Sequence, residues 1–230
     1  MTLPAVVEVV SLSKSFRQGD LSVEVLKGLD FAVHEGETVA IVGQSGSGKS
    51  TLLAMLAGLD LPTAGAVRLD GTDLASLSEE KVTRFRSEKM GIVFQQFHLM
   101  SSLTALENVG LPLEIRGERD FSTRASAALN QVGLGHRLKH FPSQLSGGEC
   151  QRVAIARSIV TNPRILLADE PSGNLDGRTG EQVMDLLFSL VRDRRMTMIL
   201  VTHNHDLAAK CDRIMLLEHG QVHQVRETPV

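Results

Sequence analysis

Residues 43–51, with the sequence GQSGSGKST, combine three glycines with a lysine and several hydroxyl side chains. Their spacing fits the pattern G-x-x-x-x-G-K-[ST]. Glycines allow the backbone to curl so that successive N–H groups face a phosphate, and the N-terminal end of a following helix adds positive potential. Lys49 supplies a mobile positive charge, and the Ser50 hydroxyl suits Mg²⁺. The predicted phosphate-binding residues are Gly43, Gln44, Ser45, Gly46, Ser47, Gly48, Lys49, Ser50 and Thr51.

A second glycine-rich stretch, LSGGECQR at 145–152, has no lysine. Ser146 and Glu149 have the spacing of a capping box, which by itself predicts a well-capped helix. Two glycines in the first turn weaken a helix, however, and they make sense if a ligand approaches the backbone closely. Two interpretations therefore stand side by side: an ordinary helix start, and a second phosphate site at Ser146, Gly147 and Gly148.

Two adjacent acids follow the apolar run RILLA at 164–168. Asp169 suits a metal ligand, and Glu170 could orient or polarise an attacking water. Without a phosphate loop elsewhere in the chain, the pair would equally well end a strand before Pro171. Because that loop is present, we interpret Asp169 as a Mg²⁺ ligand and Glu170 as catalytic.

Two further polar side chains follow short apolar runs. Gln95 follows GIVF at 91–94 and could link a metal and the attacking water to more distant parts of the protein. His203 comes after TMILV at 197–201 and could donate to a terminal phosphate, although a lone histidine there is more often packed or solvated. Their position at strand ends favours function, so Gln95 is a catalytic and metal-binding candidate and His203 a catalytic one.

The elements that must position these residues are short and apolar. Four runs lack polar alternation and are too short for helices, which predicts parallel strands buried on both faces. Polar chemistry follows the carboxyl end of each run, and ligands bind at that edge of open parallel sheets. The four coincidences predict one site. The runs are 38–42, 91–94, 164–168 and 197–201.

Helical stretches separate these strands, so the sequence predicts an α/β fold with a mainly parallel sheet. The N-terminal segments VVEVVSLSKSF, VEVLKGLDFAV and AVRLDG predict a small antiparallel layer, and RIMLLEHGQVHQV predicts a hairpin that turns at His219-Gly220. The expected helices run from Lys49 to Gly58, from Ser122 as N-cap to Gly133, from near Gly148, and roughly over 180–191.

The composition excludes several classes of protein. The chain has 230 residues, with 24 Lys+Arg against 27 Asp+Glu and a net charge of −3, so we expect no nucleic-acid partner. Its two cysteines are no disulfide framework and fit a reducing compartment. The N-terminus lacks signal-peptide features, and no apolar run approaches the ~18 residues of a membrane span. We expect a soluble cytosolic protein without membrane insertion.

Over essentially its whole length, the chain resembles the ATP-binding-cassette ATPases. The resemblance rests on GQSGSGKST, Gln95, LSGGECQR, ILLADEPSGNLD and Thr202-His203, in that family's order and spacing. It implies a P-loop NTPase (RecA-like) core with a mainly parallel sheet, an N-terminal antiparallel β-subdomain and an inserted helical subdomain. The expected single domain spans 1–230, with the core in 1–95 and 160–230 and the helical subdomain in 96–159.

The resemblance also implies a shared catalytic site. In that family two cassettes stack head to tail, and the LSGG stretch of one closes over the γ-phosphate of ATP held by the other. Ser146, Gly147 and Gly148 would then serve a neighbouring copy. Asp176 matches the loop that communicates between the two sites.

Four further side chains acquire roles from the resemblance. Glu170 matches the catalytic carboxylate, His203 the switch histidine and Gln95 the loop that senses the transporter. Phe16 matches the aromatic residue that stacks on adenine, the alternative being a core residue of the β-layer.

Three positions depart from the family's pattern. Cys150 stands where glutamine or arginine is commoner, Asn204 where aspartate is frequent, and Ser172 replaces threonine. None of them removes a phosphate-contacting group, so we expect activity to survive.

The stretch FQQFHLMSSLTALENVGLPLEIRG resembles the lipoprotein-release and macrolide-export subfamily. This resemblance implies a homodimer that uses ATP and Mg²⁺ and lies on the inner face of the cell membrane, bound to an integral membrane permease. The groove for the permease would involve Phe97, Leu99, Met100, Leu103 and Leu106, unless these residues fill their own subdomain's core.

Two rival cassette classes fit less well. DNA-associated cassettes carry a long coiled-coil or metal-binding insertion between the glycine loops, and residues 52–145 have no room for one. Translation-factor cassettes carry two ATP sites per chain. A regulator in which ATP-driven pairing signals to a cell-wall enzyme stays open, and copurification of a membrane subunit would discriminate.

Overall fold

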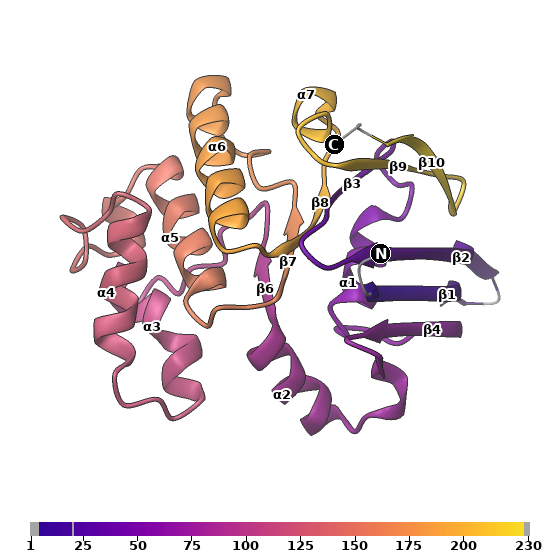
Figure 1. Cartoon of the computed structure of the whole chain (residues 1–230), viewed down its shortest axis with the longest axis horizontal. Helices are drawn as coiled ribbons and strands as arrows, with labels where there is room; N and C mark the ends of the chain where they lie inside the picture. Colours follow the sequence, from indigo (N-terminus) through magenta and orange to yellow (C-terminus); the bar gives the residue numbers. More distant parts are fainter. Residues whose placement is uncertain (1–4, 20, 228–230) are drawn as a thin grey trace. The chain divides into compact units, whose positions relative to one another are not determined.

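The computed structural model describes residues 5–19 and 21–227. These residues form two compact units. The first contains the chain up to Arg86 and again from Met196 onward, and the second contains Ser87–Arg195. Figure 1 shows the strand-rich first unit and the helix-rich second unit. The finer division into core and helical subdomain stays a prediction.

The first unit contains the predicted antiparallel layer. Its strand order is β2-β1-β4-β5, and each neighbouring pair is antiparallel. Alternate residues of β1 such as Val7 and Val9 are buried, which is the pattern of a sheet with one face on the core. The strands are β1 (Ala5–Gln18), β2 (Leu21–His34), β4 (Ala64–Leu69) and β5 (Thr72–Asp73).

A second sheet of the first unit has the order β10-β9-β3-β8. As predicted, β3 is fully buried, and it runs parallel to both β8 and β9. The predicted hairpin is also present, because His219 and Gly220 have φ angles of 51° and 79°, as a two-residue type I′ turn requires. The strands are β3 (Thr38–Val42), β8 (Thr197–Val201), β9 (Arg213–Glu218) and β10 (Gln221–Glu227).

Helix α1 (Lys49–Leu56) begins at the predicted residue and ends two residues before Gly58, with Ala57 as its C-cap. Gly58 has a φ of 59° and donates to the Met55 carbonyl, while Leu59 donates to the Ala54 carbonyl. This is a Schellman motif, in which glycine tolerates the left-handed conformation. The remaining helical segments of the unit are η1 (Leu74–Ser76), the first part of α2 (Glu79–Lys89) and α7 (His205–Ala208).

The second unit packs four helices with a parallel strand pair. Strand β6 (Met90–Val93) pairs with β7 (Ile165–Asp169), and α5 contacts α3, α4, α6 and β6. The predicted strands at 91–94 and 164–168 are thus shifted by one residue each. The helices are α3 (Ala105–Ile115), α4 (Phe121–Gln131), η2 (Pro142–Gln144), α5 (Gly147–Ile159) and α6 (Gly177–Asp193).

Two predicted helix starts are wrong. Ser122 does not cap α4, because it lies inside the helix, which begins at Phe121 with Asp120 as its N-cap, two residues earlier than predicted. Helix α6 begins at Gly177 instead of near residue 180, because the Asp176 carboxylate accepts a hydrogen bond from the Thr179 N–H. This bond satisfies a first-turn donor and therefore starts the helix three residues early.

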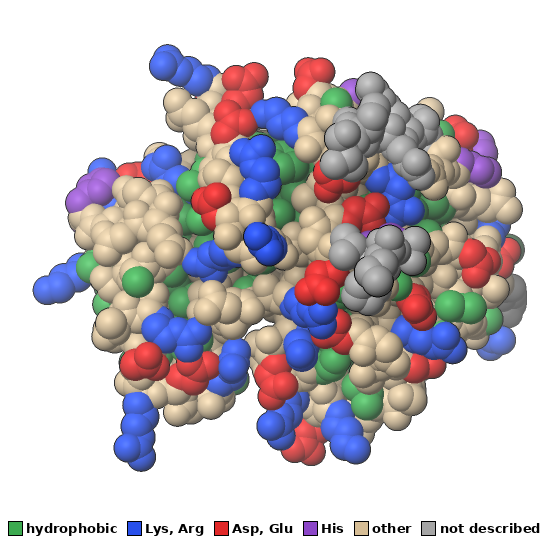
Figure 2. All heavy atoms as spheres, viewed as in Figure 1, with side chains coloured by type: hydrophobic (Ala, Val, Ile, Leu, Met, Phe, Trp, Pro, Cys, Tyr) green, Lys and Arg blue, Asp and Glu red, His purple; other side chains and the backbone are tan. Residues whose placement is uncertain are grey.

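No helix among residues 5–19 and 21–227 has the length and hydrophobicity of a membrane span. On the face drawn in Figure 2, lysine and arginine side chains and acidic side chains are scattered among uncharged surface.

Candidate functional site

The phosphate loop has the curled backbone that its glycines predict. Gly46 and Gly48 have φ angles of 80° and 102°, a region that other residues rarely adopt. Gly48 also caps α1 without a side-chain hydrogen bond. The first-turn N–H groups of α1 therefore receive no acceptor from their cap, which is the arrangement that binds anions.

Hydrogen bonds within the loop already hold the side chain of its lysine in place. Lys49 is 8% exposed, and its Nζ donates to the carbonyls of Gly43 and Gln44, each at 2.9 Å. An ammonium has three N–H donors, so one remains for a phosphate. The Ser47 hydroxyl is buried without a hydrogen-bond partner in the described part of the chain. A buried hydroxyl without a partner costs free energy, so the loop contains an unsatisfied polar group.

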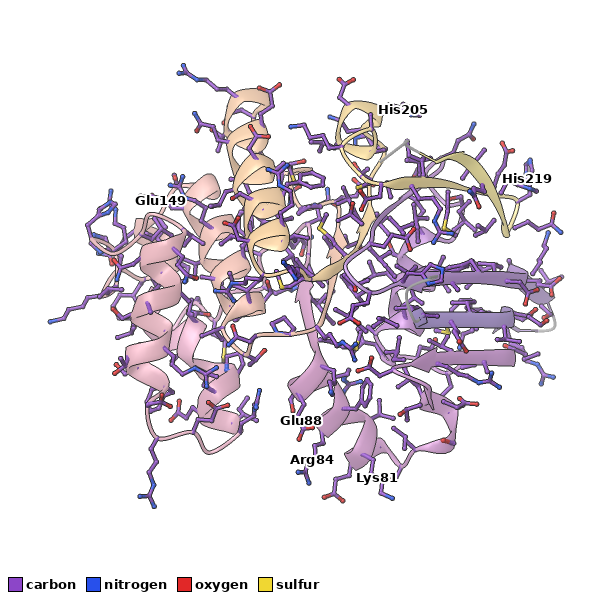
Figure 3. The ribbon with its side chains drawn as sticks, in the orientation of Figure 1. Lys81, Arg84, Glu88, Glu149, His205 and His219 are labelled. Carbon is purple, nitrogen blue, oxygen red and sulfur yellow. The ribbon has the colours of Figure 1, made fainter. Side chains whose placement is uncertain are left out.

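A cavity of about 630 Å³ lies beside this loop. His203, which comes shortly after β8, and the phosphate loop both line this cavity. This agrees with the prediction that the residues following the buried strands of the first unit lie at one site. Figure 3 shows His205 at the start of α7 and His219 at the hairpin turn, and both also line the cavity. The remaining lining comes from residues 23–25, Lys27, 42–47, 216–218 and Gly220.

Phe16 lies on β1 opposite Val23 of β2. The phenyl ring is 43% exposed and Val23 is 52% exposed, so the alternative that Phe16 fills the core of the β-layer is wrong. The Lys14 ammonium lies 4.9 Å from the ring centroid, which adds a cation–π contact. The exposed ring is available for stacking, and its contact with adenine stays a prediction.

In the second unit, the strand pair places the predicted acids and Gln95 at one edge. Val93 pairs with Ala168, so the two parallel strands end side by side. Asp169 is the last residue of β7, and Glu170 follows with a φ of 43°. A non-glycine residue with positive φ is uncommon, and Glu170 is one of seven such residues in the described part of the chain.

The partner of Gln95 was not predictable from the sequence. Asn174, in the turn before α6, donates from Nδ2 to the Gln95 backbone carbonyl at 3.1 Å and accepts from the Gln95 side-chain Nε2 at 3.3 Å. An asparagine in a glycine-containing turn usually bonds locally, so sequence spacing could not have revealed a partner 79 positions away.

The second glycine stretch forms the predicted capping box. Ser146 Oγ accepts from the Glu149 N–H at 3.2 Å, and Glu149 Oε2 accepts from the Ser146 N–H at 2.8 Å. Arg137 adds an ion pair at 3.0 Å. The hydrogen bond from the Ser146 N–H holds the pKa of Glu149 below its ordinary value. The helix start is therefore stabilised without a ligand; Figure 3 labels Glu149 on α5.

The two glycines at this helix start differ in how much space their surroundings leave for a side chain. A Cβ on Gly148 would lie 2.4 Å from Thr179 Cγ2, so a side chain there would force Thr179 on α6 to move. A Cβ on Gly147 would be 3.4 Å from Leu175 Cδ2, an ordinary contact. Packing within the chain thus accounts for Gly148 but not for Gly147. Asp176, the exposed N-cap of α6, lies on the neighbouring turn.

None of the predicted permease residues is fully buried. Met100 is 48% exposed, and Phe97, Leu99, Leu103 and Leu106 are partly exposed. Arg157 of α5 fixes the backbone of this segment, because its guanidinium donates hydrogen bonds to the carbonyls of residues 97 and 98.

Comparison with known proteins agrees with the geometry. The ABC transporter family pattern matches residues 26–173. The chain belongs to this family of ATP-binding-cassette ATPases, and it is an ATP-binding and ATP-hydrolysing subunit.

Among its relatives is the uncharacterized ABC transporter ATP-binding protein YbbA of Escherichia coli K12, 52% identical over 95% of this chain and 97% of the relative. The lipoprotein-releasing system ATP-binding protein LolD of Hydrogenovibrio crunogenus is 50% identical over 94% of each chain. The ATP-binding cassette MJ0796, solved as a post-hydrolysis dimer with ADP and Pi, is 39% identical with a TM-score of 0.87, and the match covers 96% of this chain and 100% of that one.

Proposed function

We propose that two copies of this chain bind two ATP molecules in a shared interface and drive a separate membrane permease, in lipoprotein release or a related envelope process. The similarity to LolD and to a dimeric cassette supports this proposal. The observation that carries it is the presence of two glycine loops of different construction, one with an uncapped helix start and one with a capped helix start.

The phosphate loop would hold the nucleotide of its own chain. Residues 43–51 would surround the phosphates with backbone N–H groups, and Lys49 would give its remaining N–H to them. Phe16 would stack on the adenine, since its ring is exposed.

The candidate metal ligands fit Mg²⁺ by their chemistry. Ser50, Gln95 and Asp169 offer a hydroxyl, a carboxamide and a carboxylate oxygen, and Mg²⁺ prefers such hard donors together with substrate phosphates. When bound, the ion neutralises charge on the phosphates. Glu170 would orient and deprotonate the attacking water, and His203 would donate to the γ-phosphate.

The signature loop would complete the site of the other copy. The Ser146 oxygen already accepts from its own helix, which leaves the hydroxyl hydrogen to be donated to a phosphate. Gly147 is exposed and carries no side chain that would keep a phosphate away. Asp176 would contribute to communication between the two sites.

The partly exposed residues Phe97, Leu99, Met100, Leu103 and Leu106 would receive the permease. The subunit would then work on the cytoplasmic face of the cell membrane, held there by the permease and without inserting into the bilayer.

A hydrolysis-deficient variant tests this proposal. With ATP and Mg²⁺, the Glu170→Gln protein is expected to retain nucleotide and to have the molar mass of a dimer in light scattering. The reason is that the γ-phosphate that joins the two copies is not removed. Adding Ser146→Arg should return this variant to a monomer that still binds ATP. A Glu170→Gln protein that hydrolyses ATP normally, or a Ser146→Arg protein that still pairs, would contradict the proposal.

A further inference from the structure

Asn174 and Gln95 are joined by two hydrogen bonds that run in opposite directions. Asn174 Nδ2 donates to the Gln95 backbone oxygen at 3.1 Å, and Gln95 Nε2 donates to Asn174 Oδ1 at 3.3 Å. One carboxamide therefore fixes both the main chain and the side chain of the glutamine that follows β6.

The chemistry of these groups determines which way each amide faces. A backbone carbonyl only accepts, so Asn174 must turn its NH₂ group toward it. The Asn174 oxygen then faces the Gln95 side chain, and only the NH₂ of Gln95 can satisfy it. Gln95 Oε1 takes part in neither bond. This is the atom of the carboxamide that can coordinate a cation.

The turn that carries Asn174 leaves room for this arrangement. A Cβ on Gly173 would lie 2.8 Å from Gln95 Nε2 and 3.2 Å from its Cδ, so the glutamine side chain lies directly over the glycine. The Gly173 N–H donates to the Glu170 carbonyl at 2.9 Å. A single tight turn thus joins the proposed catalytic carboxylate to the residue that holds Gln95.

We propose that Asn174 is a positioning residue for the Mg²⁺ site: it holds the Gln95 carboxamide with its oxygen, and not its NH₂, available to the ion. This inference rests on the proposed metal role of Gln95. Without Asn174, the carboxamide of Gln95 can rotate, and orientations that present NH₂ to the cation compete with the productive one.

The test measures the Mg²⁺ concentration that gives half of the ATP-dependent dimer, by light scattering, in a Glu170→Gln background without turnover. Asn174→Ala is expected to raise this concentration about three- to tenfold, the loss expected for one or two exposed hydrogen bonds. ATP affinity measured in EDTA should not change. Asn130→Ala, which removes the same carboxamide from an exposed site at the end of α4, is the matched control and should leave both quantities unchanged.

Two further variants separate positioning from general damage. In a Gln95→Ala background, Asn174→Ala should add nothing, because it acts through a side chain already removed. Gly173→Ala keeps Asn174 but displaces Gln95, and the backbone tolerates alanine because Gly173 has no positive φ. It should raise the Mg²⁺ requirement to a similar degree with no change in melting temperature.

The possible failures are distinguishable. If Gln95→Ala raises the Mg²⁺ requirement and Asn174→Ala does not, or if the two effects simply add, the positioning role of Asn174 is overturned and the metal role of Gln95 stands. If neither variant changes the requirement, both roles are overturned, whereas the ATP-induced dimer of Glu170→Gln still tests the proposed function independently.

Discussion

The two glycine loops of this protein differ in how they satisfy the backbone N–H groups at the start of the helix that follows. At α1, the cap is Gly48, which has no side chain to offer, and the N–H groups of the first turn await an acceptor. At α5, Ser146 and Glu149 satisfy each other's backbone N–H groups. The first loop needs an anion, and the second is complete without one.

A glycine-rich helix start is therefore not by itself a site that binds a phosphate of its own chain's nucleotide. The phosphate loop has a buried lysine with one N–H left over for an anion, and a buried hydroxyl without a partner in the described part of the chain. The signature loop offers only a hydroxyl hydrogen and an open approach at Gly147. Such a loop suits intermittent contact with a phosphate that another copy holds, because it loses little when the copies separate.

The largest expected effect concerns the lysine of the first loop. Lys49→Ala should weaken ATP binding about 10- to 100-fold, the range for loss of a charged hydrogen bond to phosphate. Calorimetric titration with ATP measures the change. The matched substitution in the second loop, Ser146→Arg, should leave the affinity of the single chain as it is. Equal losses in the two variants would remove the distinction between the loops.

The glycines of the second loop form a natural matched pair. Gly148→Ala should destabilise the fold by about 1–3 kcal/mol, because its methyl group would overlap Thr179. Gly147→Ala should change the free energy of unfolding by no more than about 0.5 kcal/mol yet lower ATPase activity, since its methyl group stands where the phosphate would approach. Urea denaturation together with a phosphate-release assay separates the two. Normal activity in a stable Gly147→Ala protein would argue against phosphate contact there.

A smaller effect concerns the exposed ring of the first unit. Phe16→Ala should weaken ATP affinity about tenfold, the typical value of base stacking on an aromatic side chain. Its melting temperature should barely change, because the ring is 43% exposed. Fluorescent-nucleotide titration and thermal melts provide the two measurements. A variant with unaltered affinity would mean that the ring does not contact adenine.

The smallest expected effect is the pH dependence of the second helix start. The pKa of Glu149 is lowered from its ordinary value of 4.5, chiefly by the Ser146 N–H. A lowered carboxyl pKa means stabilisation that is present above the ordinary value and is lost as the pH falls through the folded value. Glu149→Gln should therefore melt slightly below the parent protein at pH 7, and the gap should close below about pH 4. A gap that widens in acid would contradict the capping role.

The buried strands were predictable because their signal is local. Four continuous apolar runs and the His219-Gly220 turn need no knowledge of distant residues, and the structure has strands and a hairpin at those places. The role of Ser146 as N-cap of α5 was equally predictable from the sequence, since its capping partner Glu149 is three residues away.

The errors and omissions arise where distant or competing contacts decide. Helix α4 begins at Phe121 without a side-chain hydrogen bond from Asp120, so no cap marks its start, whereas Asp176 starts α6 early by accepting from the Thr179 N–H. Gly148 is required by Thr179, which is 31 positions away, and Gln95 is held by Asn174. No spacing rule relates these pairs, because only the packing of α5, α6 and the turns brings them together.

The central claim is that neither copy contains a complete catalytic site. The direct test is ATP hydrolysis per molecule of purified protein, measured over a dilution series in which light scattering reports the fraction of dimer. We predict that activity per molecule falls in step with the dimer. Undiminished activity in solutions that contain only monomers would contradict the account.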